Sequence, residues 1–342
     1  MNLQERIQAG LNGDYSGLKN GFHRLNNYIF GLQKGTYYLL GGQSGTFKTT
    51  LVDFMLFNAI EDARAKGIPL HVFYYSYEID HLTKQCNWLS VVIYQKYGVV
   101  VSPEKIKGLG DFRLTPDEQK MVNDCIPDVD AMFAKITFEF TPTNPTGIYH
   151  QLWTHHASRG KFKTEPYTDI DGNKKEKIIG YTPNDPKEIT ISVLDHMYFL
   201  KKERGFQTKE TIDKFSEYCV QLRNLFGHTS INIQQFNSAL SSVERVKFKG
   251  ADLSPQQSDF RDSTNPFADA DVVLGTLNPF KLDIDNILGY DVDSLNGGML
   301  MLKVIKNRLS ADNVAIAIFA NPKAGSFTEL PKPEEIIYAN YK

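Results

Sequence analysis

The chain has 342 residues, of which 41% are hydrophobic and 23% are charged, a composition typical of globular proteins. This length suffices for one large α/β domain or two smaller ones. Its formal net charge of −2 excludes a global positive field that would attract nucleic acid, so any such contact must come from local loops.

Cysteine spacing and the apolar runs exclude further classes of protein. Cys86, Cys125 and Cys219 are an odd number without close spacing, which predicts neither a disulfide framework nor a zinc site. We therefore expect a reducing, cytoplasmic setting. The N-terminus carries no apolar run of signal-peptide length, and the most apolar stretches are too short to cross a bilayer, so no membrane partner is expected.

An N-terminal arm, residues 1–20, is the first predicted element. Leu3, Ile7 and Leu11 recur at helical spacing, and a glycine-rich joint follows them. Three apolar residues on one stripe cannot stabilise a helix alone. We therefore expect this helix to pack on another element, such as a neighbouring subunit.

From Thr36 onward, short apolar runs alternate with longer helical patterns. This rhythm predicts βαβ units and a mostly parallel central sheet flanked by helices, an α/β fold. The expected strands are Thr36–Leu40, Leu70–Tyr75, Ile136–Phe140, Ile189–Leu194, Thr229–Ile233, Val272–Thr276, Leu300–Lys306 and Val314–Ala320. We expect the last two to form a C-terminal antiparallel hairpin across a turn near residues 310–313.

Residues 160–186 differ in composition from their surroundings. Lys, Asp, Pro and Gly dominate here, and Asp171-Gly172 indicates a hairpin turn. We interpret the segment as a surface insertion whose lysines favour a solvated face over a binding patch.

Residues 41–50 read Gly-Gly-Gln-Ser-Gly-Thr-Phe-Lys-Thr-Thr and lie between a predicted strand and a predicted helix. Gly42, Lys48 and Thr49 fit the phosphate-loop pattern Gly-x-x-x-x-Gly-Lys-Thr, in which the lysine reaches the β- and γ-phosphates and the threonine hydroxyl binds Mg²⁺. Backbone N–H groups of such a loop converge on phosphate oxygens, and the following helix adds its positive end. The residues expected to contact a nucleotide are Gly42, Ser44, Gly45, Thr46, Phe47, Lys48, Thr49 and Thr50.

Phe47 stands where the pattern has its second glycine. If the backbone there requires a positive φ, a bulky residue is strained. Alternatively, the loop tolerates a side chain at this position that points away from the phosphates. A chance Gly/Ser/Thr turn before a helix is the remaining interpretation of the whole segment.

Polar residues at the ends of three further strands complete the predicted site. Asp195 follows a buried strand and is placed to hold Mg²⁺ together with Thr49. Glu78 could orient the attacking water, or it could be an acid that favours a helix N-terminus. Gln235 could contact the γ-phosphate and relay its loss to distant loops, or belong to a solvated polar strand end.

Six motifs, taken in order, resemble one family. They are Gly21-Phe-His-Arg-Leu25 with Gly31-Leu-Gln-Lys-Gly35, Ser76-Tyr-Glu-Ile79, Leu194-Asp-His-Met197, Gln234-Gln-Phe-Asn237, Asp259-Phe-Arg-Asp-Ser263 with Asp269-Ala-Asp-Val-Val273, and Lys306-Asn-Arg308. Their order and spacing resemble the C-terminal ATPase domain of DnaB-type replicative helicases, a RecA-like P-loop fold that forms hexameric rings. The resemblance covers roughly residues 20–330.

The resemblance implies roles for several of these residues. Glu78 would be the catalytic glutamate, Asp195 the Mg²⁺ carboxylate and Gln235 the sensor. Arg308 would be an arginine finger that enters the next subunit's site, with Lys306 beside the same nucleotide. The alternative for Arg308 is a surface arginine paired with a carboxylate.

The family grips DNA with loops that line the ring. Here the candidate cations are Lys201, Lys202, Arg204, Arg245, Lys247, Lys249 and Arg261. Phosphate contacts of this kind are independent of sequence and sensitive to salt. Several subunits that each offer a few cations need no basic net charge, although a solvated loop is the alternative for each lysine.

The sequence departs from the family at Phe47, at Ser238, at Thr264 and in the insertion at 160–186. A core-only chain of this kind is expected in a bacteriophage, acting in the host cytoplasm. The domain prediction is therefore an arm at 1–20, a RecA-like ATPase domain at 21–330 and a C-terminal tail at 331–342.

The function expected from the resemblance is ATP-dependent DNA unwinding in replication, with ATP and Mg²⁺ as cofactors. Single-stranded DNA, further copies of the chain in a ring, and primase or other replisome proteins are the expected partners. Two alternatives remain open: a RecA-like recombinase that forms filaments, and a catalytically weakened assembly or loader protein. A clock-type or signalling ATPase of the same core is a more distant third.

Overall fold

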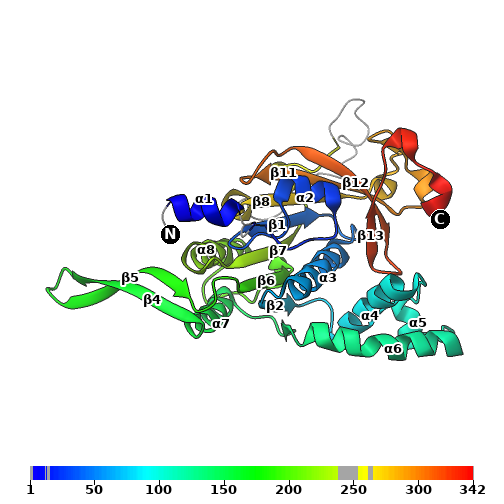
Figure 1. Cartoon of the computed structure of the whole chain (residues 1–342). Coiled ribbons are helices and arrows are strands. Elements are labelled where there is room, and N and C mark those ends of the chain that lie inside the picture. The colour runs from blue at the N-terminus through cyan, green and yellow to red at the C-terminus, as the bar shows by residue number, and fades with distance from the viewer. Residues whose placement is uncertain (1–2, 12, 14–15, 238–252, 261–264, 342) are drawn as a thin grey trace.

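The computed structural model describes residues 3–11, 13, 16–237, 253–260 and 265–341. Within these residues, one nine-stranded sheet has the order β13-β12-β11-β8-β1-β7-β6-β2-β3 (Figure 1). Its strands are β1 (Tyr37–Gly42), β2 (Leu70–Ser76), β3 (Ile136–Glu139), β6 (Ile189–Asp195), β7 (Thr229–Gln235), β8 (Val272–Leu277), β11 (Met299–Asn307), β12 (Val314–Asn321) and β13 (Ser326–Glu329). Each predicted strand is present, with its ends within two residues of the expected positions.

The sheet is parallel from β8 to β3, and β11 to β13 extend it in antiparallel fashion. β11 pairs antiparallel with β12, as the sequence predicted. The structure therefore confirms the expected α/β architecture with its C-terminal antiparallel hairpin.

The central strands are buried on both faces, and their side chains alternate between two cores. On β1, Tyr38 and Leu40 belong to one hydrophobic cluster, whereas Tyr37 and Leu39 belong to the other. This alternation follows from the two-residue period of a strand. Both faces need covering, which explains why these strands are continuously apolar rather than alternating with polar residues.

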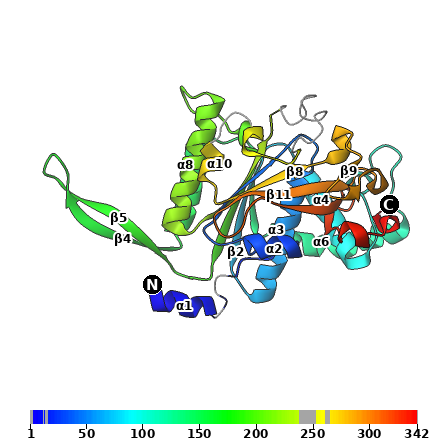
Figure 2. The ribbon, with the colours of Figure 1, turned by 90° about the horizontal axis from the view of Figure 1, so that it is seen from above.

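Helices cover the two faces in separate groups (Figure 2). One face packs against α2 (His23–Ile29), α3 (Lys48–Lys66), α4 (His81–Tyr97) and α6 (Pro116–Phe133). The other face packs against α7 (Pro145–Ala157), α8 (Thr208–Phe226) and α10 (Asn265–Asp269). The short α5 (Pro103–Lys107) follows α4. No described helix is both long and apolar enough to cross a membrane.

Two segments project from the same side of the molecule in both ribbon views (Figures 1 and 2). One is α1 (Leu3–Leu11), which carries the predicted apolar stripe. The other is the hairpin of β4 (Gly160–Thr168) and β5 (Lys174–Pro183), which lies within the predicted insertion. The Asp171-Gly172 turn is at its tip, where Gly172 has a φ of 81°.

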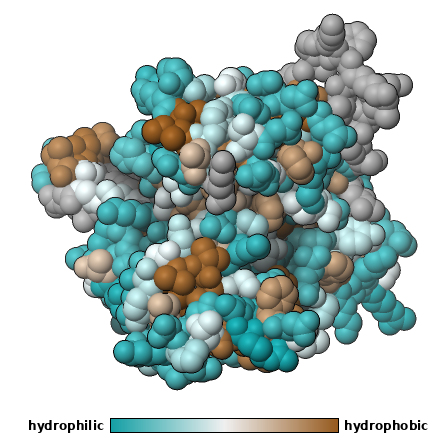
Figure 3. Space-filling view, turned by 90° about the vertical axis from the view of Figure 1, so that its right-hand side faces the viewer, coloured by the Kyte–Doolittle hydropathy of each residue, from teal (hydrophilic) through white to brown (hydrophobic). Residues whose placement is uncertain are grey.

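The segments that flank the core pack against it. Leu18 is fully buried and forms a bridge with Leu32, so the end of the N-terminal arm joins the main domain. Near the C-terminus, Tyr338 and Tyr341 pack on a small cluster with β9 (Asn286–Ile287) and β10 (Tyr290–Asp291). The side of the molecule opposite the hairpin is largely hydrophilic, with hydrophobic groups in separate patches (Figure 3), as is usual for exposed surfaces.

Candidate active site

Four neighbouring strands end at one edge of the sheet and bring the predicted site residues together. Gly42 at the end of β1 pairs with Gln235 at the end of β7 and with Thr276 on β8. Ser76 at the end of β2 pairs with Asp195 at the end of β6. The carboxyl edge of the parallel strands therefore carries the phosphate loop, Gln235, Asp195 and the segment with Glu78, which is where open α/β sheets bind ligands.

The glycines of the loop are required by close packing and by backbone conformation. A Cβ on Gly42 would lie 2.2 Å from Thr276 Oγ1 and 2.5 Å from Thr46 Oγ1. These two hydroxyls are themselves 2.9 Å apart, so the loop is tied to β8. Gly45 has a φ of 72°, in the left-handed region that favours glycine.

Phe47 also adopts the left-handed conformation, with φ 56° and ψ 28°, at the residue before α3. This conformation costs a residue with a Cβ about 1–2 kcal/mol relative to the right-handed form. The ring is partly buried and packs against the core beneath α3. Both sequence-based interpretations therefore hold in part, because the backbone is strained while the side chain packs into the core.

Lys48 and Thr49 begin α3 and point into the site. The Lys48 ammonium donates to the Gln43 carbonyl at 2.7 Å, which folds it back over its own loop. Burial lowers the pKa of Lys48 to about 8, against the opposing effect of Asp195 and Glu78. Thr49 Oγ1 donates to Asp195 Oδ2 at 2.7 Å, so the two predicted metal ligands are in contact.

Asp195 is almost fully buried at the end of β6. Burial raises the pKa of its carboxyl to about 6, although the Lys84 ammonium and the Thr49 hydroxyl favour the ionised form. Its Oδ1 has no hydrogen-bond partner among the described residues. A buried carboxylate with an unused oxygen beside a threonine hydroxyl fits a hydrated Mg²⁺ at the mouth of a phosphate loop.

Glu78 lies just beyond β2 and is half-exposed. Its Oε1 is 3.5 Å from His196 Nε2, and the Tyr198 N–H donates to the other ring nitrogen of His196. Sequence patterns assign His196 no role, because a histidine next to a strand-end aspartate carries no signal of its own. Its position indicates that it holds the Glu78 carboxylate near the loop.

A buried ion pair supports the site from below and was also missed. Lys84 on α4 is fully buried and donates to both carboxylate oxygens of Asp53 on α3, at 2.9 and 2.7 Å. Tyr74 on β2 donates to Asp53 Oδ1 at 2.8 Å. The charge of Lys84 favours the ionised form of Asp195, so this pair acts on the predicted metal ligand.

Lys306 and Arg308 lie at the opposite edge of the sheet. Asn307 pairs with Val272 at the start of β8, and the Arg308 N–H donates to the Asp271 carbonyl. The Arg308 guanidinium, about half-exposed, lies 3.3 Å from Asp271 Oδ1 and donates to the Ala268 carbonyl at 2.9 Å. The six-residue length of β1, roughly 20 Å, separates this amino edge from the loop. The fold therefore does not bring Arg308 or Lys306 to the loop of the same chain.

The predicted DNA-contacting cations fall into two groups. Lys201, Lys202 and Arg204 are exposed just after the 3₁₀ helix η1 (Met197–Phe199), beyond the carboxyl end of β6. Four others lie outside the described residues, as do the departures Ser238 and Thr264: Arg245, Lys247, Lys249 and Arg261. The described residues that flank these gaps are joined, because the Asn237 N–H donates to the Asp259 carbonyl at 2.7 Å.

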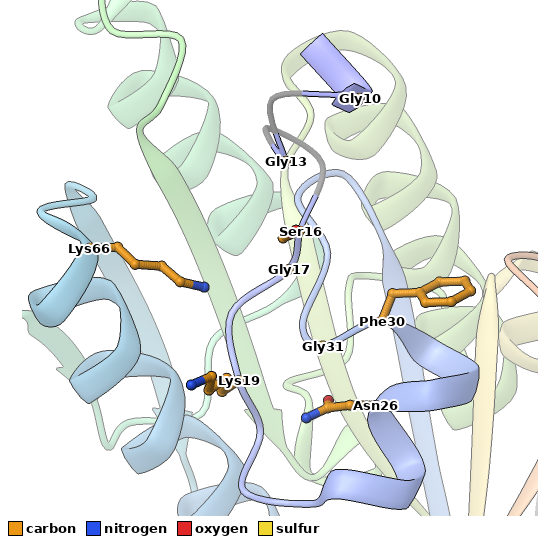
Figure 4. A pocket seen from close by; sticks show the side chains of 9 residues that line it. All are labelled: Gly10, Gly13, Ser16, Gly17, Lys19, Asn26, Phe30, Gly31 and Lys66. Carbon is orange, nitrogen blue, oxygen red and sulfur yellow. The ribbon is translucent and has the colours of Figure 1, made fainter. Parts of the chain in front are cut away.

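A cavity of about 580 Å³ lies away from this site, beside the N-terminal arm (Figure 4). Glycines form much of its wall, and Lys66 lines one side. The Lys66 ammonium is 2.6 Å from Asp62 Oδ2, so its charge is already matched. This cavity thus lacks the convergent polar groups that mark a ligand site.

Neither a family model nor a curated protein matches the sequence. Among solved structures, the chain resembles an isolated helicase ATPase domain, with a TM-score of 0.68 and 14% identity over 96% of this chain and 99% of that one. It also resembles a DnaB-like replicative helicase described with its interactions with primase, with a TM-score of 0.67 and 14% identity. That match covers 96% of this chain and 66% of the helicase chain.

The chain has the RecA-like fold of a DnaB-type helicase ATPase domain. The resemblance inferred from six short motifs is therefore confirmed at the level of the fold. At 14% identity the likeness establishes the path of the backbone in this DnaB-type fold, and the roles of individual residues rest on the geometry above.

Proposed function

We propose that the chain is an ATP-dependent replicative DNA helicase that moves along single-stranded DNA as a ring of identical subunits, six as in the family. The observation that carries this proposal is the convergence of Lys48, Thr49 and Asp195 at the carboxyl edge of the sheet, with Thr49 Oγ1 and Asp195 Oδ2 only 2.7 Å apart. That constellation is suited to hold a nucleoside triphosphate and Mg²⁺.

Each residue of the site has a distinct task in hydrolysis. The loop backbone and Lys48 bind the phosphates, while Thr49 and Asp195 hold Mg²⁺. When bound, Mg²⁺ neutralises charge on the phosphate oxygens. Glu78, held by His196, orients the attacking water and accepts its proton. Gln235, in register with Gly42, is placed to detect whether the γ-phosphate is present.

Arg308 acts on the next subunit, because its own loop lies at the far edge of the sheet. A head-to-tail assembly places the amino edge of one subunit against the carboxyl edge of the next. The N-terminal arm leaves from the same amino edge, through the bridge between Leu18 and Leu32 just before β1. Leu3, Ile7 and Leu11 are 56–77% exposed, so this arm carries an apolar stripe that a neighbouring copy can cover.

Single-stranded DNA contacts the loops beyond β6 and β7, which carry Lys201, Lys202 and Arg204 and the cations outside the described residues. These loops follow the strands that carry Asp195 and Gln235. Loss of the γ-phosphate can therefore shift the loops and the DNA that they hold. Primase is the further partner that the proposal implies.

A mixing experiment tests the proposal. Lys48→Ala and Arg308→Ala subunits should each lack ATPase activity in the presence of single-stranded DNA. Mixed and reassembled, they should regain part of it, because some interfaces then join an intact loop to an intact Arg308. An Arg308→Ala protein that hydrolyses ATP at the wild-type rate would refute the finger in trans, as would inactive mixtures that still form rings.

One observation favours a second candidate, a ring or loader protein that has lost turnover. Phe47 strains the loop at a position where glycine is usual. Undetectable DNA-stimulated ATPase activity in a wild-type protein that still assembles would favour this candidate over the helicase.

A further inference from the structure

A second lysine lies at the phosphate loop, and no sequence pattern marks it. Lys281 belongs to the 3₁₀ helix η4 (Pro279–Leu282), which follows the carboxyl end of β8. A Cβ placed on Gly45 would lie 2.0 Å from Lys281 Nζ. The ammonium therefore rests directly on the loop, in space that only a glycine at position 45 leaves open.

The backbone that carries Lys281 is fixed relative to the loop. Thr276, near the end of β8, bonds to both sides of it, to Thr46 Oγ1 at 2.9 Å and to the Gly41 carbonyl at 3.2 Å. Asn278 donates to the Gly297 carbonyl at 3.2 Å, and Pro279 is buried. The lysine is therefore delivered to the loop by a short, anchored segment.

The charges around the loop are unbalanced without an anion. Lys48 and Lys281 are close enough that the charge of Lys281 opposes protonation of Lys48. Asp195 and Glu78 attract Lys48, but Lys281 forms no ion pair with any carboxylate among the described residues. Two ammonium groups beside a turn of backbone N–H groups make a site for a polyphosphate.

We propose that Lys281 is a second phosphate-binding lysine in cis, which contacts the nucleotide's phosphate chain from the β8 side of the loop. This inference rests on the proposed nucleotide site and adds a residue to it. Lys281 approaches from the strand on one side of β1, whereas Gln235, Asp195 and Glu78 approach from the strands on the other. The phosphates then lie between two groups of polar side chains.

The test is a series of affinities for ATP in a non-hydrolysable form, ADP and adenosine, measured by calorimetry on wild type, Lys281→Ala and Lys281→Arg. Lys281→Ala should weaken binding of both phosphorylated ligands about five- to tenfold, or roughly 1–1.4 kcal/mol. Lys281→Arg should retain most of the affinity. Any adenosine binding should be unchanged, because the lost contact is to phosphate.

The control is Lys332→Ala, which removes an exposed lysine distant in sequence from the loop, in the C-terminal segment. It should leave all affinities unchanged. The inference is overturned if Lys281→Ala binds ADP and the ATP analogue as wild type does, or if adenosine binding falls by the same factor. Lys48→Ala separates the two levels: if it too binds nucleotide normally, the nucleotide site itself is wrong.

Discussion

At the scale of single residues, Phe47 decides whether the loop works as built. Its backbone already holds the left-handed conformation that a glycine would adopt, and its ring packs on the core rather than over the loop. We therefore expect Phe47→Gly to change the DNA-stimulated ATPase rate by less than about threefold. Strain relief of about 1–2 kcal/mol is offset by the lost packing of a partly buried ring, so stability should change little. A gain of tenfold or more in hydrolysis would show that the natural loop is impaired.

Lys84 is the second residue whose replacement separates two effects. Lys84→Met should destabilise the fold by about 3–5 kcal/mol, because it leaves the Asp53 carboxylate buried without its partner. The double variant Lys84→Met with Asp53→Leu should recover much of that loss, since it removes both charges. Urea unfolding of the two proteins measures the difference. A double variant no more stable than the single one would mean that the pair is needed for more than charge balance.

At the scale of elements, three buried histidines join α7, β6 and the start of β7. His156 Nε2 is 3.1 Å from His228 Nδ1, and His228 Nε2 is 2.8 Å from Ser192 Oγ. Burial lowers the pKa of His156 to about 3 and that of neighbouring His155 to about 4, and it holds the pKa of His228 well below its usual range. All three rings are therefore neutral in the folded protein near pH 7.

This cluster predicts a loss of stability in mild acid. Below about pH 6.5 the unfolded chain binds protons on these rings and the folded chain does not, so unfolding becomes easier as the pH falls towards 4. The expected slope is roughly 1 kcal/mol per histidine for each pH unit below about 6. His156→Asn should flatten the dependence of the unfolding free energy on pH between 7 and 5, whereas His23→Asn, at an exposed position on α2, should not. Equal slopes in wild type and His156→Asn would contradict this account.

The strands were predictable because each is a local apolar run, and Asp195 and Gln235 were predictable because polar residues follow such runs. The contacts of Lys84 with Asp53, and of Lys281 with Gly45, join segments that are distant in sequence. Neither pair leaves a local pattern, because a lysine in a helix or after a strand is most often exposed. The hairpin shows the same limit: Asp171-Gly172 indicated the turn, but alternating polar residues did not indicate strands of nine and ten residues.

At the scale of the whole molecule, the two edges of the sheet carry complementary halves of one site. The carboxyl edge holds the loop, and the amino edge holds Arg308 and the N-terminal arm. Activity should then depend on assembly, and assembly on the apolar stripe of α1. The triple variant Leu3→Ala, Ile7→Ala and Leu11→Ala keeps helix propensity while it removes most of the exposed apolar surface of α1.

We expect this variant to unfold at the wild-type temperature, because the three side chains lie outside the core of the single chain. Mass photometry should show fewer rings at equal protein concentration, and the DNA-stimulated ATPase rate should fall in proportion. Gln4→Ala, at an exposed polar position of the same helix, is the matched control and should assemble normally. Intact rings in the triple variant would mean that the stripe is not a subunit contact. Intact hydrolysis by monomers would mean that Arg308 is not needed in trans.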